Sequence, residues 1–148
     1  MRTTIFYFSG TGNCLKVAGD LVSELDDAEI VSIPKVINRE IDCSAERIGI
    51  VFPVYIFGMP LLVENFIKRL KPEKDKYIFA VATYGGMAAD TLGQAARQLK
   101  RQGLKLSAGF LVKMPGNYTP LYEAIPVKKQ QKIFAAGQQR IKNIARIV

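Results

Sequence analysis

The segment from Ser9 to Cys14 combines the residue types that bind a phosphate group at the start of a helix. Glycines at positions 10 and 12 let the backbone approach an anion, and Ser9, Thr11 and Asn13 add side-chain donors. Successive N–H groups would converge there, at the positive end of the helix dipole. The segment contains no Lys or Arg, so uncharged dipoles would have to hold the anion. Taken alone, it is explained equally well as an ordinary strand-to-helix turn.

The same segment excludes three other functions. A dinucleotide-binding fingerprint needs a third glycine where Leu15 stands, and a P-loop needs Gly-Lys-Ser/Thr, which the chain lacks. A phospho-accepting receiver domain needs carboxylates after its first and third strands, where Ser9 and Pro53 stand instead.

Two further segments follow expected strands and combine aromatic residues with glycine. They are Pro53, Val54, Tyr55, Ile56, Phe57 and Gly58, and then Thr83, Tyr84, Gly85 and Gly86. The three aromatic side chains can stack on a flat ring, each such pair contributing about 0.5–1.5 kcal/mol beyond burial. Any one of them could be ordinary core packing. Three in two loops, beside a phosphate-binding segment, favour a site for a phosphorylated ring system.

The elements that must position these loops alternate strand and helix along the chain. The expected strands are Thr3–Phe8, Ile30–Ile33, Arg47–Phe52, Tyr77–Ala82 and Leu104–Val112. Lys35–Arg47 fits a turn or loop with at most a short helix. Five strands joined by right-handed crossovers predict an α/β protein, a three-layer sandwich with a five-stranded parallel sheet in the order 2-1-3-4-5. Ligands of such sheets bind beyond the carboxyl ends of the strands, where the strand order reverses.

Four segments have the three-and-four spacing of a buried helix face. Their stripes are Cys14, Leu15, Ala18, Leu21, Val22 and Leu25; Leu62, Val63, Phe66, Ile67 and Leu70; Ala88, Ala89, Leu92, Ala95, Ala96 and Leu99; and Phe134, Gly137, Ile141, Ile144 and Val148. Pro60 suits a first helical turn, and Gly103 suits a helix end.

Composition favours one cytoplasmic domain over residues 1–148. No apolar run approaches a membrane span, and no secretory leader is recognisable. Two cysteines, Cys14 and Cys43, without any histidine argue against a zinc or iron–sulfur site built by this chain alone, and a reducing compartment disfavours a disulfide.

The net charge is +8, and residues 127–148 contain six cations and no acid. A solvated helix face explains this pattern better than a dedicated surface for acidic partners, nucleic acid or an anionic membrane. The sequence also lacks a base-reading motif, which argues against nucleic-acid binding.

On these motifs the sequence resembles the flavodoxin family over essentially its whole length. Ser9, Thr11, Gly12 and Asn13 match the family's Thr/Ser-x-Thr-Gly-Asn-Thr loop, and Cys14 replaces the last threonine. FPVYIFGMP (52–60) and MPGNY (114–118) are similar to the flavodoxin half of fused flavodoxin–ferredoxin proteins.

The resemblance implies a flavodoxin-like fold, noncovalently bound FMN and electron transfer between redox partners. It implies that Ser9, Gly10, Thr11, Gly12, Asn13, Cys14 and Leu15 hold the phosphate, the segments 53–58 and 83–86 hold the ring, and Asn117 and Tyr118 act as lids.

Two departures qualify this expectation. The cysteine clusters of a ferredoxin domain are missing, and the chain is basic where electron carriers of the family are typically acidic. The chain would then be a stand-alone relative, the product of a split gene or a piece that lacks its partner domain, and an acidic ferredoxin-type protein is one candidate redox partner. An FMN-dependent NAD(P)H or quinone oxidoreductase and a flavin-free binding module with a basic last helix remain as alternatives, and the oligomeric state stays open.

Overall fold

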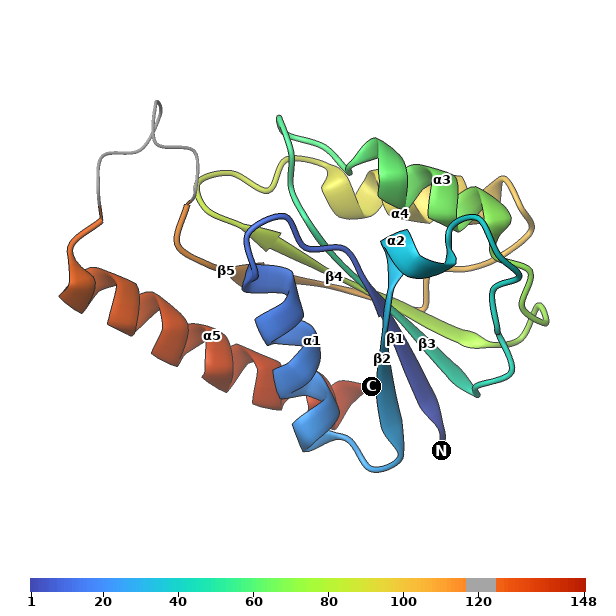
Figure 1. Cartoon of the computed structure of the whole chain (residues 1–148), viewed down its shortest axis with the longest axis horizontal. Coiled ribbons are helices and arrows are strands. Elements are labelled where there is room, and N and C mark those ends of the chain that lie inside the picture. The colour runs from blue at the N-terminus through green and yellow to red at the C-terminus, as the bar shows by residue number, and fades with distance from the viewer. Residues whose placement is uncertain (117–124) are drawn as a thin grey trace.

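The computed structural model describes residues 1–116 and 125–148. Its strands are β1 (Thr3–Tyr7), β2 (Ala28–Ser32), β3 (Arg47–Pro53), β4 (Tyr77–Tyr84) and β5 (Ala108–Lys113), and its helices are α1 (Asn13–Glu24), α2 (Ile33–Val36), α3 (Leu61–Arg69), α4 (Thr91–Lys100) and α5 (Val127–Ile147). All neighbouring strands pair in parallel, in the order β2-β1-β3-β4-β5 (Figure 1). The predicted fold class and strand order are confirmed.

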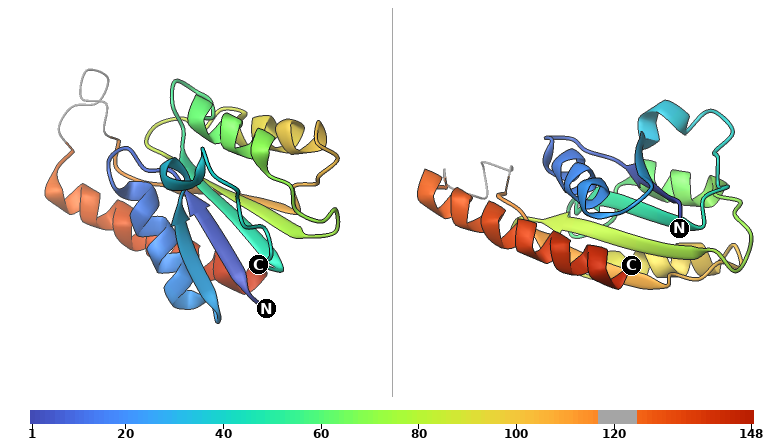
Figure 2. Two further views of the ribbon diagram at one scale, coloured as in Figure 1. Left: turned by 45° about the vertical axis from the view of Figure 1, so that its right-hand side comes forward. Right: turned by 90° about the horizontal axis from the view of Figure 1, so that it is seen from below.

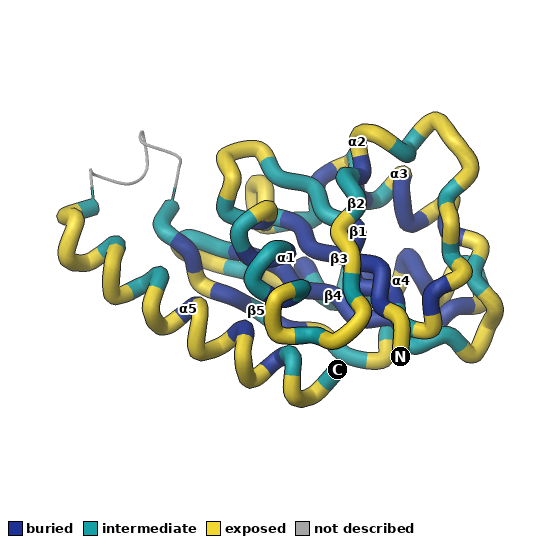
Figure 3. The backbone as a smooth tube through the Cα atoms, turned by 60° about the horizontal axis from the view of Figure 1, so that its bottom comes forward, coloured by how far each residue is buried: buried dark blue, intermediate teal, exposed yellow. Residues whose placement is uncertain are grey.

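Helices cover both faces of this sheet. Helices α1 and α5 pack together on one face, and α3 and α4 pack together on the other, as the two views of Figure 2 show. The central strands are therefore buried on both sides, which explains their continuous runs of Ile, Val, Phe and Ala. Figure 3 shows the buried backbone concentrated in this middle layer, with the outer faces of the helices exposed.

The register of the strands places the loops that follow β1, β3 and β4 at the same edge of the sheet. Tyr7 pairs with Val51, and Pro53 pairs with Thr83 two residues further along β3. The chain then leaves β1 toward α1 on one face and leaves β3 toward α3 on the opposite face. The reversal of strand order thus separates these two loops and opens space between them.

Gly103 ends α4 as predicted. Its φ is +73°, its N–H donates to the Lys100 carbonyl at 3.0 Å, and the Leu104 N–H donates to the Leu99 carbonyl at 3.0 Å. These two bonds form a Schellman motif, and Leu99 and Leu104 both belong to the hydrophobic core on the α3/α4 face.

Several predicted boundaries were wrong. The last strand begins at Ala108, whereas Leu104 completes the end of α4. Helix α4 begins at Thr91, so Ala88 and Ala89 lie before it, and Ala89 has the left-handed φ of +48°. The second strand runs from Ala28 to Ser32, which leaves Ile33 to start α2.

Three smaller differences concern the ends of elements. Leu15 is 43% exposed, because it lies to one side of the buried face of α1, which consists of Cys14, Val17, Ala18 and Leu21. Pro60 is the N-cap of α3 rather than its first helical residue, and β4 extends to Tyr84.

No helix within the described residues has both the length and the hydropathy of a membrane span.

We expect Gly103→Ala and Gly19→Ala to change stability in opposite directions. Alanine at position 103 must adopt a positive φ, which costs about 1 kcal/mol, whereas a methyl group at position 19 meets nothing within 4 Å and improves helix propensity by about 0.8–1.0 kcal/mol. Urea unfolding of both variants measures these changes. Equal stabilisation by both variants would contradict the left-handed helix end.

Candidate functional site

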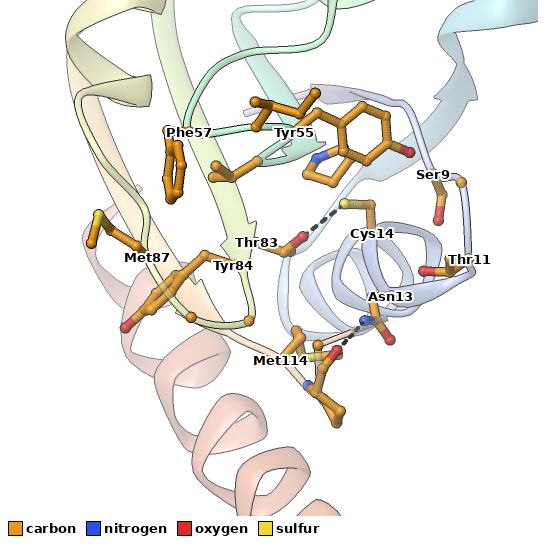
Figure 4. A pocket seen from close by; sticks show the side chains of 18 residues that line it. Ser9, Thr11, Asn13, Cys14, Tyr55, Phe57, Thr83, Tyr84, Met87 and Met114 are labelled. Atoms are coloured by element: carbon orange, nitrogen blue, oxygen red, sulfur yellow. Dashed lines mark hydrogen bonds between the residues drawn. The ribbon is translucent and has the colours of Figure 1, made fainter. Parts of the chain in front are cut away.

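A cavity of about 700 Å³ opens at the carboxyl edge of the sheet (Figure 4). It is bounded by the three predicted loops together with the residues that follow β5. The lining residues are Ser9, Gly10, Thr11, Asn13, Cys14, Pro53, Val54, Tyr55, Ile56, Phe57, Thr83, Tyr84, Gly85, Gly86, Met87, Met114, Pro115 and Gly116.

Most of the residues predicted for the site line this cavity, but three of the described ones do not. Gly12, Leu15 and Gly58 lie outside the lining. Gly12 instead caps α1 with a φ of +99°, a conformation that favours glycine. Asn117 and Tyr118 fall outside the described residues.

The loop between β1 and α1 forms the polar end of the cavity. Ser9 Oγ accepts a hydrogen bond from the Gly12 N–H at 2.9 Å, which closes the loop into a compact turn. Asn13 Nδ2 donates to the Pro115 carbonyl at 3.3 Å and so joins this loop to the segment after β5. The first turn of α1 contains no acidic residue, so nothing in that turn opposes an anion at its N-terminus.

Cys14 connects the polar end to the end of β4. Its side chain is 1% exposed, and its sulfur lies 3.1 Å from Thr83 Oγ1. Burial raises the pKa of the Cys14 thiol to about 12, although the hydrogen bond with Thr83 acts in the opposite direction. The thiol is therefore neutral at physiological pH and contributes packing and a hydrogen bond rather than a nucleophile.

The predicted aromatic residues divide between the two ends of the cavity. Phe57 and Tyr84 lie with Met87 at the end away from Ser9 and Thr11, as Figure 4 shows. Tyr55 instead lies near the polar end, where its hydroxyl covers Gly10 and its ring meets Phe8 edge-on at 5.9 Å. Partial burial raises the pKa of the Tyr55 hydroxyl, so it also stays protonated at neutral pH.

The loop that carries Tyr55 and Phe57 makes a strained turn. Tyr55 and Gly58 exchange two backbone hydrogen bonds, of 2.8 and 2.9 Å, and Ile56 and Phe57 between them have φ values of +46° and +60°. This is the geometry of a type I′ turn, which usually has Asn and Gly at those two positions. The Met59 N–H donates to Gln94 Oε1 of α4 at 2.9 Å, which anchors the loop from behind.

Close backbone approach forms the wall opposite that loop. A Cβ atom on Gly85 would lie 2.7 Å from Gly116 Cα, and the Met114 N–H donates to the Tyr84 carbonyl at 2.9 Å. Met87, Met114, Pro115 and Gly116 are the lining residues that sequence reasoning did not include in the site. The sequence signal for the last three was the Met-Pro-Gly that follows β5, which ends at the same edge as the other strands, and the signal for Met87 was its place directly after Gly86.

Within the parts of the chain that the structure describes, no residue that lines the cavity has a charged side chain. Its titratable groups are Cys14, Tyr55 and Tyr84, so the cavity offers neutral hydrogen-bond donors at one end and π-faces at the other. Across residues 1–116 and 125–148, no group of three or more His, Cys, Asp or Glu side chains could hold a metal ion. The described wall is suited to binding a ligand through neutral donors and aromatic faces.

The chain is similar in structure to several solved proteins, although the comparisons by sequence found no match. No protein-family model matches the chain, and no curated protein sequence matches it. Solved structures are similar over nearly the full length of both chains. They include an azoreductase from Bacillus anthracis str. Sterne (14% identity, 100% of each chain, TM-score 0.67), the two-electron reduced flavodoxin of Megasphaera elsdenii (18%, 99% of each, 0.63) and an archaeal flavodoxin (17%, 99% of each, 0.55). These likenesses establish the flavodoxin-like fold.

We expect Cys14 to resist alkylation while the protein is folded. At pH 9 an ordinary thiol is half ionised, whereas a thiol with a pKa of about 12 is ionised only to about one part in a thousand and is buried as well. Iodoacetamide labelling followed by mass spectrometry of a Cys43→Ser variant measures this, with urea-unfolded protein as the control. Equal labelling rates in the folded and unfolded states would contradict the buried Cys14–Thr83 contact.

Proposed function

We propose that this chain binds FMN in the cavity at the carboxyl edge and carries electrons between redox proteins. The observation that carries the proposal is the division of one uncharged cavity into a donor-rich end and an aromatic end. FMN has the same division, with a phosphate at one end and a flat tricyclic ring at the other. When bound, it supplies one- and two-electron chemistry that no amino-acid side chain provides.

The donor-rich end fits the phosphate. Thr11 and Asn13 present a hydroxyl and an amide at the cavity wall, and the N-terminus of α1 adds backbone N–H groups. Gly10 has no side chain, and the Tyr55 hydroxyl lies where a Cβ atom at this position would be. The role of this end would be to fix the position of the ligand's phosphate through dipoles.

The other end fits the ring. Phe57 and Tyr84 offer π-faces, and Met87 adds a polarizable side chain of the kind that packs well against aromatic rings. Gly85 and Gly86 leave their backbone amides accessible to the polar edge of a ring. The role of these residues would be to exclude water from one side of the ring while its outer edge stays reachable.

An FMN-dependent NAD(P)H or quinone oxidoreductase is the second candidate. It is favoured by the apolar outer end of the cavity, where Phe57 is 57% exposed and Met87 is 63% exposed, because a flat second substrate could stack there. Azoreductases are also among the structurally similar proteins. Steady-state turnover of NADH or NADPH with a quinone separates the two candidates, since a pure electron carrier shows none without a partner protein.

We expect FMN to bind more tightly than riboflavin by roughly a hundredfold, because one hydrogen bond to a charged group contributes about 1.5–3 kcal/mol. Thr11→Ala should weaken FMN binding by roughly tenfold and leave riboflavin binding nearly unchanged, and Thr11→Ser should retain FMN binding. Tyr84→Ala should weaken both ligands alike, because it removes a contact to the shared ring. Absorbance and flavin-fluorescence titrations of the unmodified chain and the three variants with both ligands measure these affinities.

Two outcomes would count against this assignment. Purified protein that stays colourless when FMN is added would support a flavin-free binding module instead. Equal affinities for FMN and riboflavin would show that the loop from Ser9 to Cys14 does not hold a phosphate.

We also expect bound FMN to have a less negative potential for full reduction than in an acidic flavodoxin. The fully reduced ring carries a negative charge, and the field of a chain with a net charge of +8 disfavours that charge less than an acidic protein does. Raising the salt concentration from about 0.01 M to about 1 M shortens the screening length from about 30 Å to about 3 Å and should make the potential more negative. Potentiometric titration at both concentrations measures this. A very low potential that does not respond to salt would contradict the expectation.

A further inference from the structure

Four large apolar side chains are exposed around the mouth of the cavity. They form what we call the apolar rim, and they are Ile56 (95% exposed), Leu61 (68%), Met87 (63%) and Phe57 (57%). Three of them also line the cavity, and Leu61 begins α3 at the same edge of the sheet. Contiguous exposed apolar surface on a soluble protein commonly marks a binding site.

Helix α5 extends past this edge as a basic arm. At Gly137 a Cβ atom would lie 3.6 Å from the carbonyl oxygen of Lys113, the last residue of β5. The ten residues before Gly137 therefore continue about 15 Å beyond the end of that strand, at 1.5 Å per helical residue. Figures 1 and 2 show this half of α5 projecting past the sheet. The projecting half (127–136), the basic arm, carries the exposed Lys128, Lys129 and Lys132.

Acidic side chains are scarce at the same edge. In the described segments at the mouth itself (8–16, 53–64, 83–91 and 113–116), the carboxylates are Glu64 and Asp90, and each is already paired, while Asp20 and Glu24 lie further along α1. Glu64 lies 2.8 Å from Lys68 Nζ, and Asp90 lies 2.9 Å from a guanidinium nitrogen of Arg97. The lysines of the basic arm have no acid within their own helix, since α5 contains none.

The arrangement of the charges on α5 is itself unfavourable in the isolated chain. Lys128 and Lys129 occupy the first turn of α5, next to the positive end of its dipole, where cations are destabilising. An acidic surface placed against this turn would relieve that repulsion. A second copy of this chain would add to it, because each copy carries a net charge of +8.

We propose that an acidic protein docks at the mouth of the cavity, with its apolar centre on the apolar rim and its carboxylates on the basic arm. This inference rests on the proposed function, and it names the chemistry of the redox partner and the surface that receives it. Exposed apolar groups would supply most of the binding energy, and the lysines would guide the approach and orient the partner.

The test measures the dissociation constants of two probe proteins, an acidic iron–sulfur ferredoxin and the basic cytochrome c. Isothermal titration is carried out at about 0.01 M and about 1 M salt. We expect binding of the ferredoxin but not of cytochrome c at low salt, and at least a roughly tenfold weaker affinity for the ferredoxin at high salt. No binding of the ferredoxin at low salt, or equal binding of both probes, would overturn the proposal.

Matched variants locate the surface. Lys128→Glu combined with Lys132→Glu should weaken ferredoxin binding by roughly tenfold. Lys142→Glu combined with Arg146→Glu makes the same change in net charge on the same helix, at the opposite edge, and should alter binding less than about twofold. Leu61→Ser should weaken binding, whereas Ile147→Ser, at a residue that is 60% exposed near the end of α5, should not. Equal effects of the paired variants would show that only the total charge matters.

The two proposals can fail separately. None of the four substituted lysines and arginines lines the cavity, so FMN affinity should be unchanged in both charge variants. Ferredoxin binding is measured with flavin-free protein as well as with flavin-loaded protein, so a failure to bind FMN does not hide the docking surface. Sedimentation velocity of the chain alone completes the test, because a stable dimer that buries the apolar rim would overturn the proposal.

Discussion

The common direction of the five strands is the constraint on which the other features depend. A parallel strand in the middle of the sheet uses all its backbone groups for pairing and is buried on both faces, so its side chains can only pack. The chemistry must then lie in the loops, and parallel pairing brings the loops after β1, β3 and β4 to one edge. Because β1 leads to a helix on one face and β3 to a helix on the other, these loops diverge and leave a cavity between them.

The wall of the cavity and the surface around it differ in the charge of their side chains. The described wall of the cavity contains only uncharged groups, whose hydrogen bonds act over a short range and select a ligand by geometry. The cations lie outside it, on α5 and at the end of β5, where their field extends over a screening length of about 8–10 Å at ordinary salt. The proposed ligand inside the cavity would therefore be recognised mainly through dipoles, and the proposed partner outside it mainly through net charge and apolar contact.

The sequence was sufficient to predict the sheet and three of the four segments that form the cavity, because buried parallel strands and glycine-containing strand ends leave local signals. It was insufficient where tertiary contacts decide the outcome. Leu104 has strand-forming neighbours, yet it completes the Schellman motif of α4. Ala88 and Ala89 have good helix propensity, yet the left-handed φ of Ala89 and the bond from Thr91 Oγ1 to the Ala88 carbonyl delay the helix. The contribution of Met114–Gly116 to the wall depends on the approach of Gly116 to Gly85, which periodicity cannot reveal.

The strained turn at Ile56 and Phe57 links the cavity to the surface around it. Each non-glycine residue in this region of φ costs on the order of 1–3 kcal/mol, and a β-branched residue such as Ile56 is especially unfavourable there. Asn and Gly would make the same turn with little strain. The strained conformation also leaves both side chains exposed, since Ile56 is 95% exposed and Phe57 is 57% exposed. Burial in the folded chain alone therefore does not offset the free-energy cost of this turn. A ring in the cavity or a protein over the apolar rim would cover both side chains. The turn is therefore a feature for which the proposed ligand and partner would account, and the stability of the fold alone does not.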